Sequence, residues 1–194
     1  LFVFCFLTGD VWDEAHEWAG YAIAALLCGR AVWGFVGPRH ARFADFLYRP
    51  SVIAGFLADS LRLRARRYLG HNPAGGAMVV ALLVSIAVVC LSGIMMGLDA
   101  FWGEAWVEVL HVAATWIAIA LVALHVGGVV LASLEHRENL VRAMITGRKL
   151  AAQVPPSERI TTSRLWLALI LVALLGGMLA WVVRSAPVAE PFIF

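Results

Sequence analysis

A long uncharged segment in the second half of the chain is the feature that most constrains its fold. Residues 109–134 contain no Lys, Arg, Asp or Glu. A helix needs about 20 apolar residues to cross the hydrocarbon core of a bilayer. Composition agrees, because 62% of the 194 residues are hydrophobic and 14% are charged, whereas soluble domains have roughly 25% charged residues. The chain is therefore expected to be an integral membrane protein. A net charge of +2 gives no reason to expect a nucleic-acid partner.

Further apolar runs predict four complete transmembrane helices, and their lengths favour helices over barrel strands. The expected spans are residues 15–36, 76–97, 106–134 and 163–183. The chain opens on the apolar run LFVFCFLTG, which is too short to span a bilayer and has no basic region before it. We interpret it as the remainder of a first transmembrane helix. The predicted fold class is an all-α membrane protein, a four-helix transmembrane bundle with an additional C-terminal transmembrane helix.

The charges of the loops predict how the chain is oriented in the membrane. Residues 38–75 and 134–162 carry most of the Arg and Lys, whereas residues 10–14 and 98–105 carry acidic residues and no basic ones. The positive-inside rule then makes the first two loops cytoplasmic and places the last two on the outer side of the membrane. Residues 51–67 combine apolar residues at helical spacing with late arginines. They predict an interfacial helix bound to anionic lipid, with a docking surface for a cytoplasmic partner as the alternative.

His111 and His125 are the strongest candidates for functional residues, because imidazoles in a membrane span are costly and usually serve a function. Fourteen residues at 100° each bring the two rings to within about 40° of one helix face. At 1.5 Å per residue they are about 21 Å apart along the helix axis. One ring is expected near each membrane surface, so the pair suggests two stacked metal centres.

His16 is the predicted partner of His111, since both begin helices that enter the membrane from the outside. At equal depth they can be the two axial ligands of one haem. Arg30 lies fourteen residues after His16, on the same face. Two interpretations of Arg30 remain open: it pairs with the propionates of an inner haem, or it snorkels to the interface. The second ligand of His125 is expected in a part of the first helix that precedes this sequence. The remaining histidines lie in or beside loops and are expected to be solvated: His40, His71 and His136. For His71 a position beside a quinone or propionate site is the alternative.

Several motifs in order resemble the prokaryotic cytochrome b-561 family, which includes the cytochrome b subunits of nickel–iron hydrogenases. These motifs are HEWAGY at 16–21, RAVWGFVGPRHARF at 30–43, GHNPAGGAMV at 70–79, LSG at 91–93 and HRENLVRAMITGRK at 136–149. The resemblance implies a haem-binding transmembrane domain over residues 1–150, with a linker and the extra helix over 151–194. It also implies two b haems, with His16 and His111 on the outer iron and His125 on the inner one.

The resemblance further implies electron transfer between membrane quinone and a redox partner, either a hydrogenase or a c-type cytochrome. Any enzymatic activity would be that of a quinol or quinone oxidoreductase, and homo-oligomerisation is left open. The alternative is a histidine-lined subunit of a proton or metal transporter. That function predicts acidic partners within the spans, but the acidic residues cluster at the outer helix ends.

Overall fold

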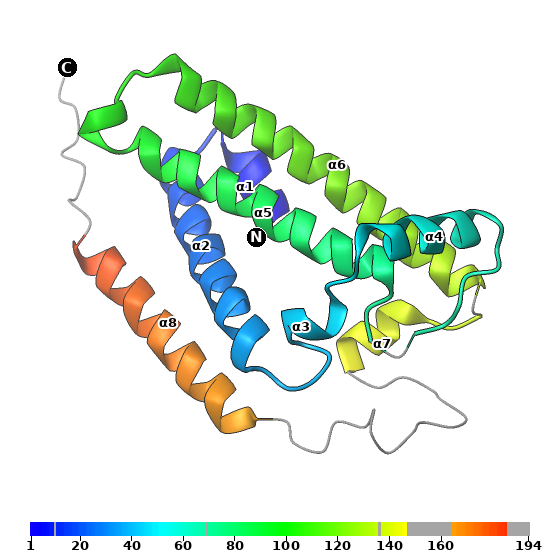
Figure 1. The fold of residues 1–194 in the computed structure, drawn as a ribbon. Helices are drawn as coiled ribbons and strands as arrows, with labels where there is room; N and C mark the ends of the chain where they lie inside the picture. Colours follow the sequence, from blue (N-terminus) through cyan, green and yellow to red (C-terminus); the bar gives the residue numbers. More distant parts are fainter. Residues whose placement is uncertain (10, 69, 136, 147–163, 186–194) are drawn as a thin grey trace. The chain divides into compact units, whose positions relative to one another are not determined.

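The computed structural model describes residues 1–9, 11–68, 70–135, 137–146 and 164–185, and every regular element in these ranges is a helix (Figure 1). The chain divides into two compact units, each described here by itself. Unit 1 contains residues 1–33 and 164–194, and unit 2 contains residues 34–163. The predicted linker, His136 and the end of the last resemblance motif, at 147–149, lie outside the described residues.

Unit 1 contains α1 (Phe2–Thr8), most of α2 (Asp13–Val36) and α8 (Leu165–Ser185). Helix α2 begins with the acidic residues Asp13 and Glu14. Their negative charges stabilise the helix because its N-terminus is the positive end of the helix dipole. Helix α8 packs against α2 at Gly29, where an added Cβ would lie 2.5 Å from Leu175. The missing side chain at Gly29 therefore allows the two helices to approach closely.

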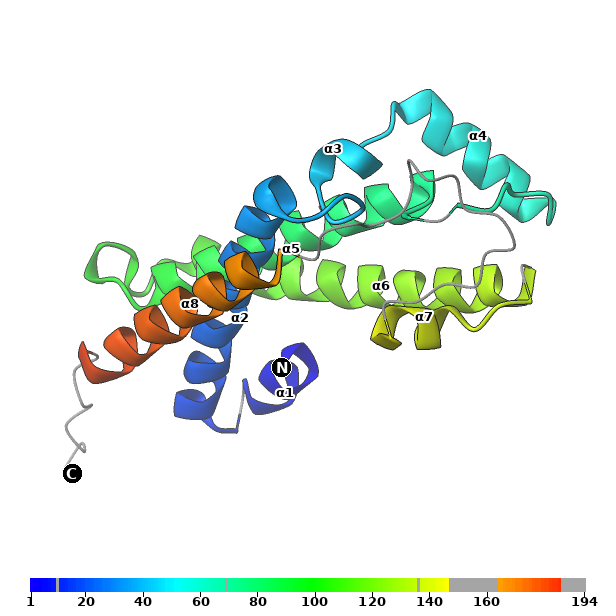
Figure 2. The same cartoon turned by 90° about the horizontal axis from the view of Figure 1, so that it is seen from below.

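Unit 2 is built around an antiparallel pair, α5 (Pro73–Met96) and α6 (Ala105–Glu135), joined through the short helix η1 (Asp99–Phe101). Both views show α5 and α6 side by side along most of their length (Figures 1 and 2). Asn72 caps α5 by accepting a hydrogen bond from the Gly75 N–H at 2.6 Å. The buried residues of the pair are mostly small, which allows close helix packing: Ser85, Ser92, Val107, Ala114 and Ala118.

Two short helices, α3 (Phe43–Phe46) and α4 (Pro50–Leu61), precede α5 in unit 2. The interfacial helix expected over residues 51–67 thus ends six residues early, at Leu61. The physical reason has a local part and a long-range part. Leu63 takes a positive φ of 53°, and the Ala65 N–H donates to Glu135 Oε1 at 2.8 Å instead of to a helix carbonyl.

The segment after α4 is held against the end of α6 by two contacts. Besides the bond from Ala65 to Glu135, the guanidinium of Arg67 pairs with Glu138 at 2.8 Å. Glu138 lies between α6 and the short helix α7 (Leu140–Thr146). The two Arg-rich loops therefore meet at the same end of the α5–α6 pair, as a shared membrane side requires.

Three of the described helices are long and apolar enough to cross a membrane, namely α2, α5 and α6. Their outer surfaces are apolar, and Leu124 and Trp116 on α6 are at least 60% exposed. Such large exposed apolar side chains suit contact with lipid. The apolar part of α8, Leu165–Trp181, is shorter than these three helices. The protein is therefore an all-helical membrane protein, and α8 as a further span stays a prediction.

Candidate functional site

His111 is held against α5 by hydrogen bonds on one ring nitrogen. Its Nδ1 lies 3.0 Å from the Val89 carbonyl oxygen and 3.1 Å from Ser92 Oγ. A carbonyl oxygen can only accept, so Nδ1 carries the proton and donates it. In a neutral imidazole the lone pair is then on Nε2, the nitrogen available to a metal. The contact with Val89 thus fixes both the ring orientation and the tautomer of His111.

His16 has the same kind of partner within unit 1. Its Nδ1 lies 2.9 Å from the carbonyl oxygen of Cys5, and the Cys5 thiol points back to the His16 carbonyl at 3.6 Å. Because the Cys5 carbonyl is an acceptor, His16 also carries a proton on Nδ1, and in the neutral imidazole the lone pair is again on Nε2. The two histidines predicted to share a haem therefore have the same tautomer.

A glycine lies beside each of these two rings. A Cβ added at Gly93 would be 3.2 Å from Cε1 of His111 and 3.5 Å from its Nδ1. A Cβ added at Gly9 would be 3.4 Å from Nδ1 of His16 and 3.5 Å from its Cε1. A side chain at either glycine would thus lie against the edge of the histidine ring.

His125 and Arg30 follow the spacing expected from the sequence. Helix α6 is continuous from Ala105 to Glu135, so its histidines, fourteen residues apart, lie on nearly the same face. Helix α2 is likewise continuous across His16 and Arg30. His125 and Arg30 are both half-buried. His16 belongs to unit 1, whereas His111 belongs to unit 2, so their pairing on one iron stays a prediction.

The donor set of His16 and His111 fits a b-type haem. Such an iron needs two neutral imidazole nitrogens, and a second hydrogen-bonded group must orient each ring. Both histidines meet the second requirement through a backbone carbonyl. Within the described ranges, no group of three or more His, Cys, Asp or Glu side chains could hold a metal ion by itself.

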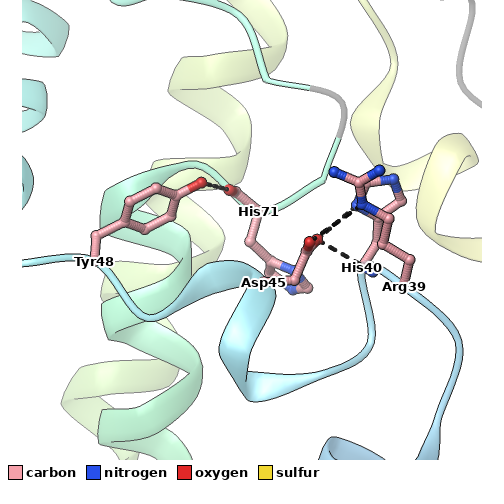
Figure 3. Close-up of polar contacts among 5 residues, drawn as sticks. All are labelled: Arg39, His40, Asp45, Tyr48 and His71. Atoms are coloured by element: carbon pink, nitrogen blue, oxygen red, sulfur yellow. Dashed lines mark hydrogen bonds and ion pairs between the residues drawn. The ribbon is translucent and has the colours of Figure 1, made fainter. Parts of the chain in front are cut away.

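A polar cluster in the part of the chain that follows α2 and precedes α5 was not expected from the sequence (Figure 3). His40 is 22% exposed, and its Nδ1 donates to Asp45 Oδ2 at 2.7 Å. Arg39 approaches the other oxygen of the same carboxylate at 3.4 Å. The ring of His71 packs on Phe46 with 4.7 Å between centroids. His40 and His71 are half-buried and contact Asp45 and Phe46, so both are less solvated than the sequence predicts.

Tyr48 completes this cluster, and its hydroxyl donates to the His71 carbonyl at 3.3 Å. Burial raises the pKa of the Tyr48 phenol above its usual value, with smaller contributions from Tyr68 and Asp45. The signal that could have revealed the cluster is Asp45, an acidic residue five positions after His40 within an Arg-rich loop. The cluster positions α3 against the start of α5, and no catalytic role is assigned to it.

Fold and site together define a class: a helical membrane protein with histidines in its apolar helices, two of which each bond a backbone carbonyl through Nδ1. Residues 2–147 match the family model of prokaryotic cytochrome b561. This chain belongs to the prokaryotic cytochrome b561 family. Membership implies a b-type haem and a function in electron transport.

Curated relatives agree with this assignment. The chain is 25% identical to a probable Ni/Fe-hydrogenase B-type cytochrome subunit of Azotobacter vinelandii, over 70% of this chain and 67% of the relative. A protein of the same name from Rhodobacter capsulatus is also 25% identical, over 70% of this chain and 61% of the relative. The aligned region thus covers about two thirds of the length of these relatives. No solved structure matches the chain.

Proposed function

We propose that this chain carries electrons across the bacterial inner membrane through two b haems, between the quinone pool and a redox partner. The observation that carries the proposal is the matched state of His16 and His111. Each lies in a candidate membrane span with its Nδ1 bonded to a backbone carbonyl, which in the neutral imidazole leaves the lone pair on Nε2 for a metal. A haem bound there supplies the one-electron chemistry, and the protein supplies ligands, orientation and a dry environment.

The proposed ligand roles are supported by the continuity of helices α2 and α6, which carry these residues. His16 and His111 hold the outer haem, and His125 supplies one ligand of the inner haem. About 21 Å of α6 separates the two histidines of that helix along its axis. Arg30, fourteen residues from His16 on α2, neutralises propionates of the inner haem. A guanidinium is suited to this role because it binds carboxylates through two parallel N–H donors.

The architecture proposed for this function is a four-helix haem bundle over residues 1–150, with α8 as an additional span within 151–194. Loops 38–75 and 134–162 face the cytoplasm, and loops 10–14 and 98–105 face the periplasm. Two observations support this arrangement: the meeting of the Arg-rich loops at one end of the α5–α6 pair, and the three apolar helices.

The electron partners proposed here are quinone in the membrane and a hydrogenase on the outer side, with a c-type cytochrome as an alternative outer partner. The hydrogenase is supported by the names of the relatives. Quinone is supported by an apolar hollow of 650 Å³ on unit 2, next to Leu47 and Ile53. An isoprenoid tail needs an apolar surface of this kind. The enzymatic activity proposed with these partners is quinol or quinone oxidoreduction.

Spectroscopy of the full-length protein in inverted membrane vesicles tests the proposal. Reduction by dithionite should produce a b-type difference spectrum, and a quinol analogue should reduce the same haems more slowly. The variant His40→Gln is the matched control, because His40 binds Asp45 and is not a proposed ligand. Absence of any b-type band in the wild-type protein would refute the cytochrome function. A band that quinol does not reduce would refute the quinone step.

A further inference from the structure

The two proposed outer ligands share a positioning arrangement that is built into the neighbouring helix. The carbonyl that binds His111 belongs to Val89, and Gly93 follows it by four residues. The carbonyl that binds His16 belongs to Cys5, and Gly9 follows it by four residues. One helical turn separates each carbonyl from its glycine, so both lie on the same face of their helix.

We propose that Gly93 is a positioning residue for the haem ligand His111. This glycine gives the imidazole edge the space it needs to reach the Val89 carbonyl one turn earlier. The resulting Nδ1–H bond keeps the lone pair of the neutral imidazole on Nε2 and fixes the plane of the ring. This inference rests on the proposed function, since it assigns a role to a glycine beside a proposed haem ligand.

The distances make the proposed role specific. A Cβ at 3.2 Å from Cε1 of His111 is closer than nearly all real contacts of this type, so the ring must move by a few tenths of an ångström. The Nδ1 of His111 is 3.0 Å from its carbonyl, so this shift lengthens or bends the hydrogen bond. At Gly9 the corresponding distance is 3.4 Å, an ordinary contact. Alanine at Gly93 should therefore perturb its histidine more than alanine at Gly9.

Ser92 adds a second acceptor at His111. Its Oγ lies 3.1 Å from Nδ1 of His111 and 2.7 Å from the Val88 carbonyl. The hydroxyl can therefore donate to Val88 while it accepts from the imidazole. Ser92 is 1% exposed, so water cannot replace this hydrogen bond without rearrangement. Its removal should alter the electron density on His111 without changing its position.

The experiment compares Gly93→Ala with Gly97→Ala in the full-length, haem-loaded protein. Gly97 is the C-cap of α5, one turn after Gly93, and an added Cβ there would meet only the Ile94 carbonyl at 3.6 Å. Three quantities are measured: haem affinity, the midpoint potential of each haem, and the g-values of the oxidised haems by electron paramagnetic resonance. Gly93→Ala should lower the affinity of the outer haem about 10- to 100-fold, as is typical when the partners of metal ligands are lost. Its g-values should also change, because they depend on the ligand planes. Gly97→Ala should match the wild type.

A second comparison decides the question if Gly93→Ala fails to accumulate. Ser92→Ala should shift the potential of one haem while haem content is retained. Ser85→Ala is the matched control, because this buried serine lies seven residues earlier on α5 and bonds the Ala114 carbonyl instead of a histidine. Equal potentials in these two variants, or equal spectra and affinities in Gly93→Ala and Gly97→Ala, would overturn the positioning role. A wild-type protein without haem would instead overturn the proposed function.

Discussion

Replacing Gly76 by alanine is expected to destabilise unit 2, because an added Cβ would overlap the backbone carbonyl of Phe46. Phe46 is 1% exposed, so the backbone of α3 cannot move away without opening a packed contact. Alanine gains roughly 0.5–1 kcal/mol over glycine within a helix. Overpacking of a filled site costs roughly 1–3 kcal/mol. The expected net loss is about 1–2 kcal/mol, since the steric cost exceeds the gain in helix propensity.

Thermal unfolding in detergent, followed by circular dichroism, measures this loss. A loss of this size lowers the midpoint by roughly 2–8 °C for a chain of this length. Gly55→Ala in α4 is the control, because an added Cβ there meets no atom within 4 Å. It should keep or slightly raise the midpoint. If Gly76→Ala were as stable as Gly55→Ala, the close packing of α3 on the start of α5 would be refuted.

Three further predictions concern the polar groups of unit 2. Burial raises the pKa of Tyr48, so the folded state holds this proton more tightly, and the contribution of Tyr48 to stability should fall as pH rises through about 10. Ultraviolet titration should show a late-ionising phenol that Tyr48→Phe lacks. Arg67→Gln should lower the unfolding free energy by less than about 1 kcal/mol, since Arg67 is 40% exposed in its pair with Glu138; a larger loss in chemical denaturation would contradict this. Asp45→Asn should cost about 1–3 kcal/mol in the same assay, because it weakens the charge-assisted bond to His40. An unchanged midpoint would refute that role.

The long helices could be predicted from the sequence because their positions depend on composition. The expected spans at 15–36, 76–97 and 106–134 correspond to α2, α5 and α6 within three residues at each end. The resemblance to the cytochrome family, carried by ordered motifs, is confirmed by the family match. The long helices and the family resemblance could both be predicted because each depends on residues that are close together in the sequence.

Other features depend on contacts between distant residues and could not be predicted in this way. Helix α4 ends at Leu61 partly because Glu135, seventy residues later than Ala65, accepts its N–H. The tautomer of His111 depends on a carbonyl twenty-two residues away. The sequence identified these histidines as candidates but gave no indication of their hydrogen-bond partners. The ligand roles of His16, His111, His125 and Arg30 stay proposals for the same reason, because they depend on groups that meet in space.

The number of haems per chain in single and double histidine variants tests the central claim most directly. If His16 and His111 hold the same iron, His16→Ala and His111→Ala should each remove one haem from a two-haem protein. The double variant should then lose no more than either single variant, while His125→Ala should remove the other haem. The ratio is obtained from the pyridine haemochrome absorbance and the protein concentration of each purified variant. Additive losses in the double variant, or full haem content in both single variants, would contradict the proposed ligation.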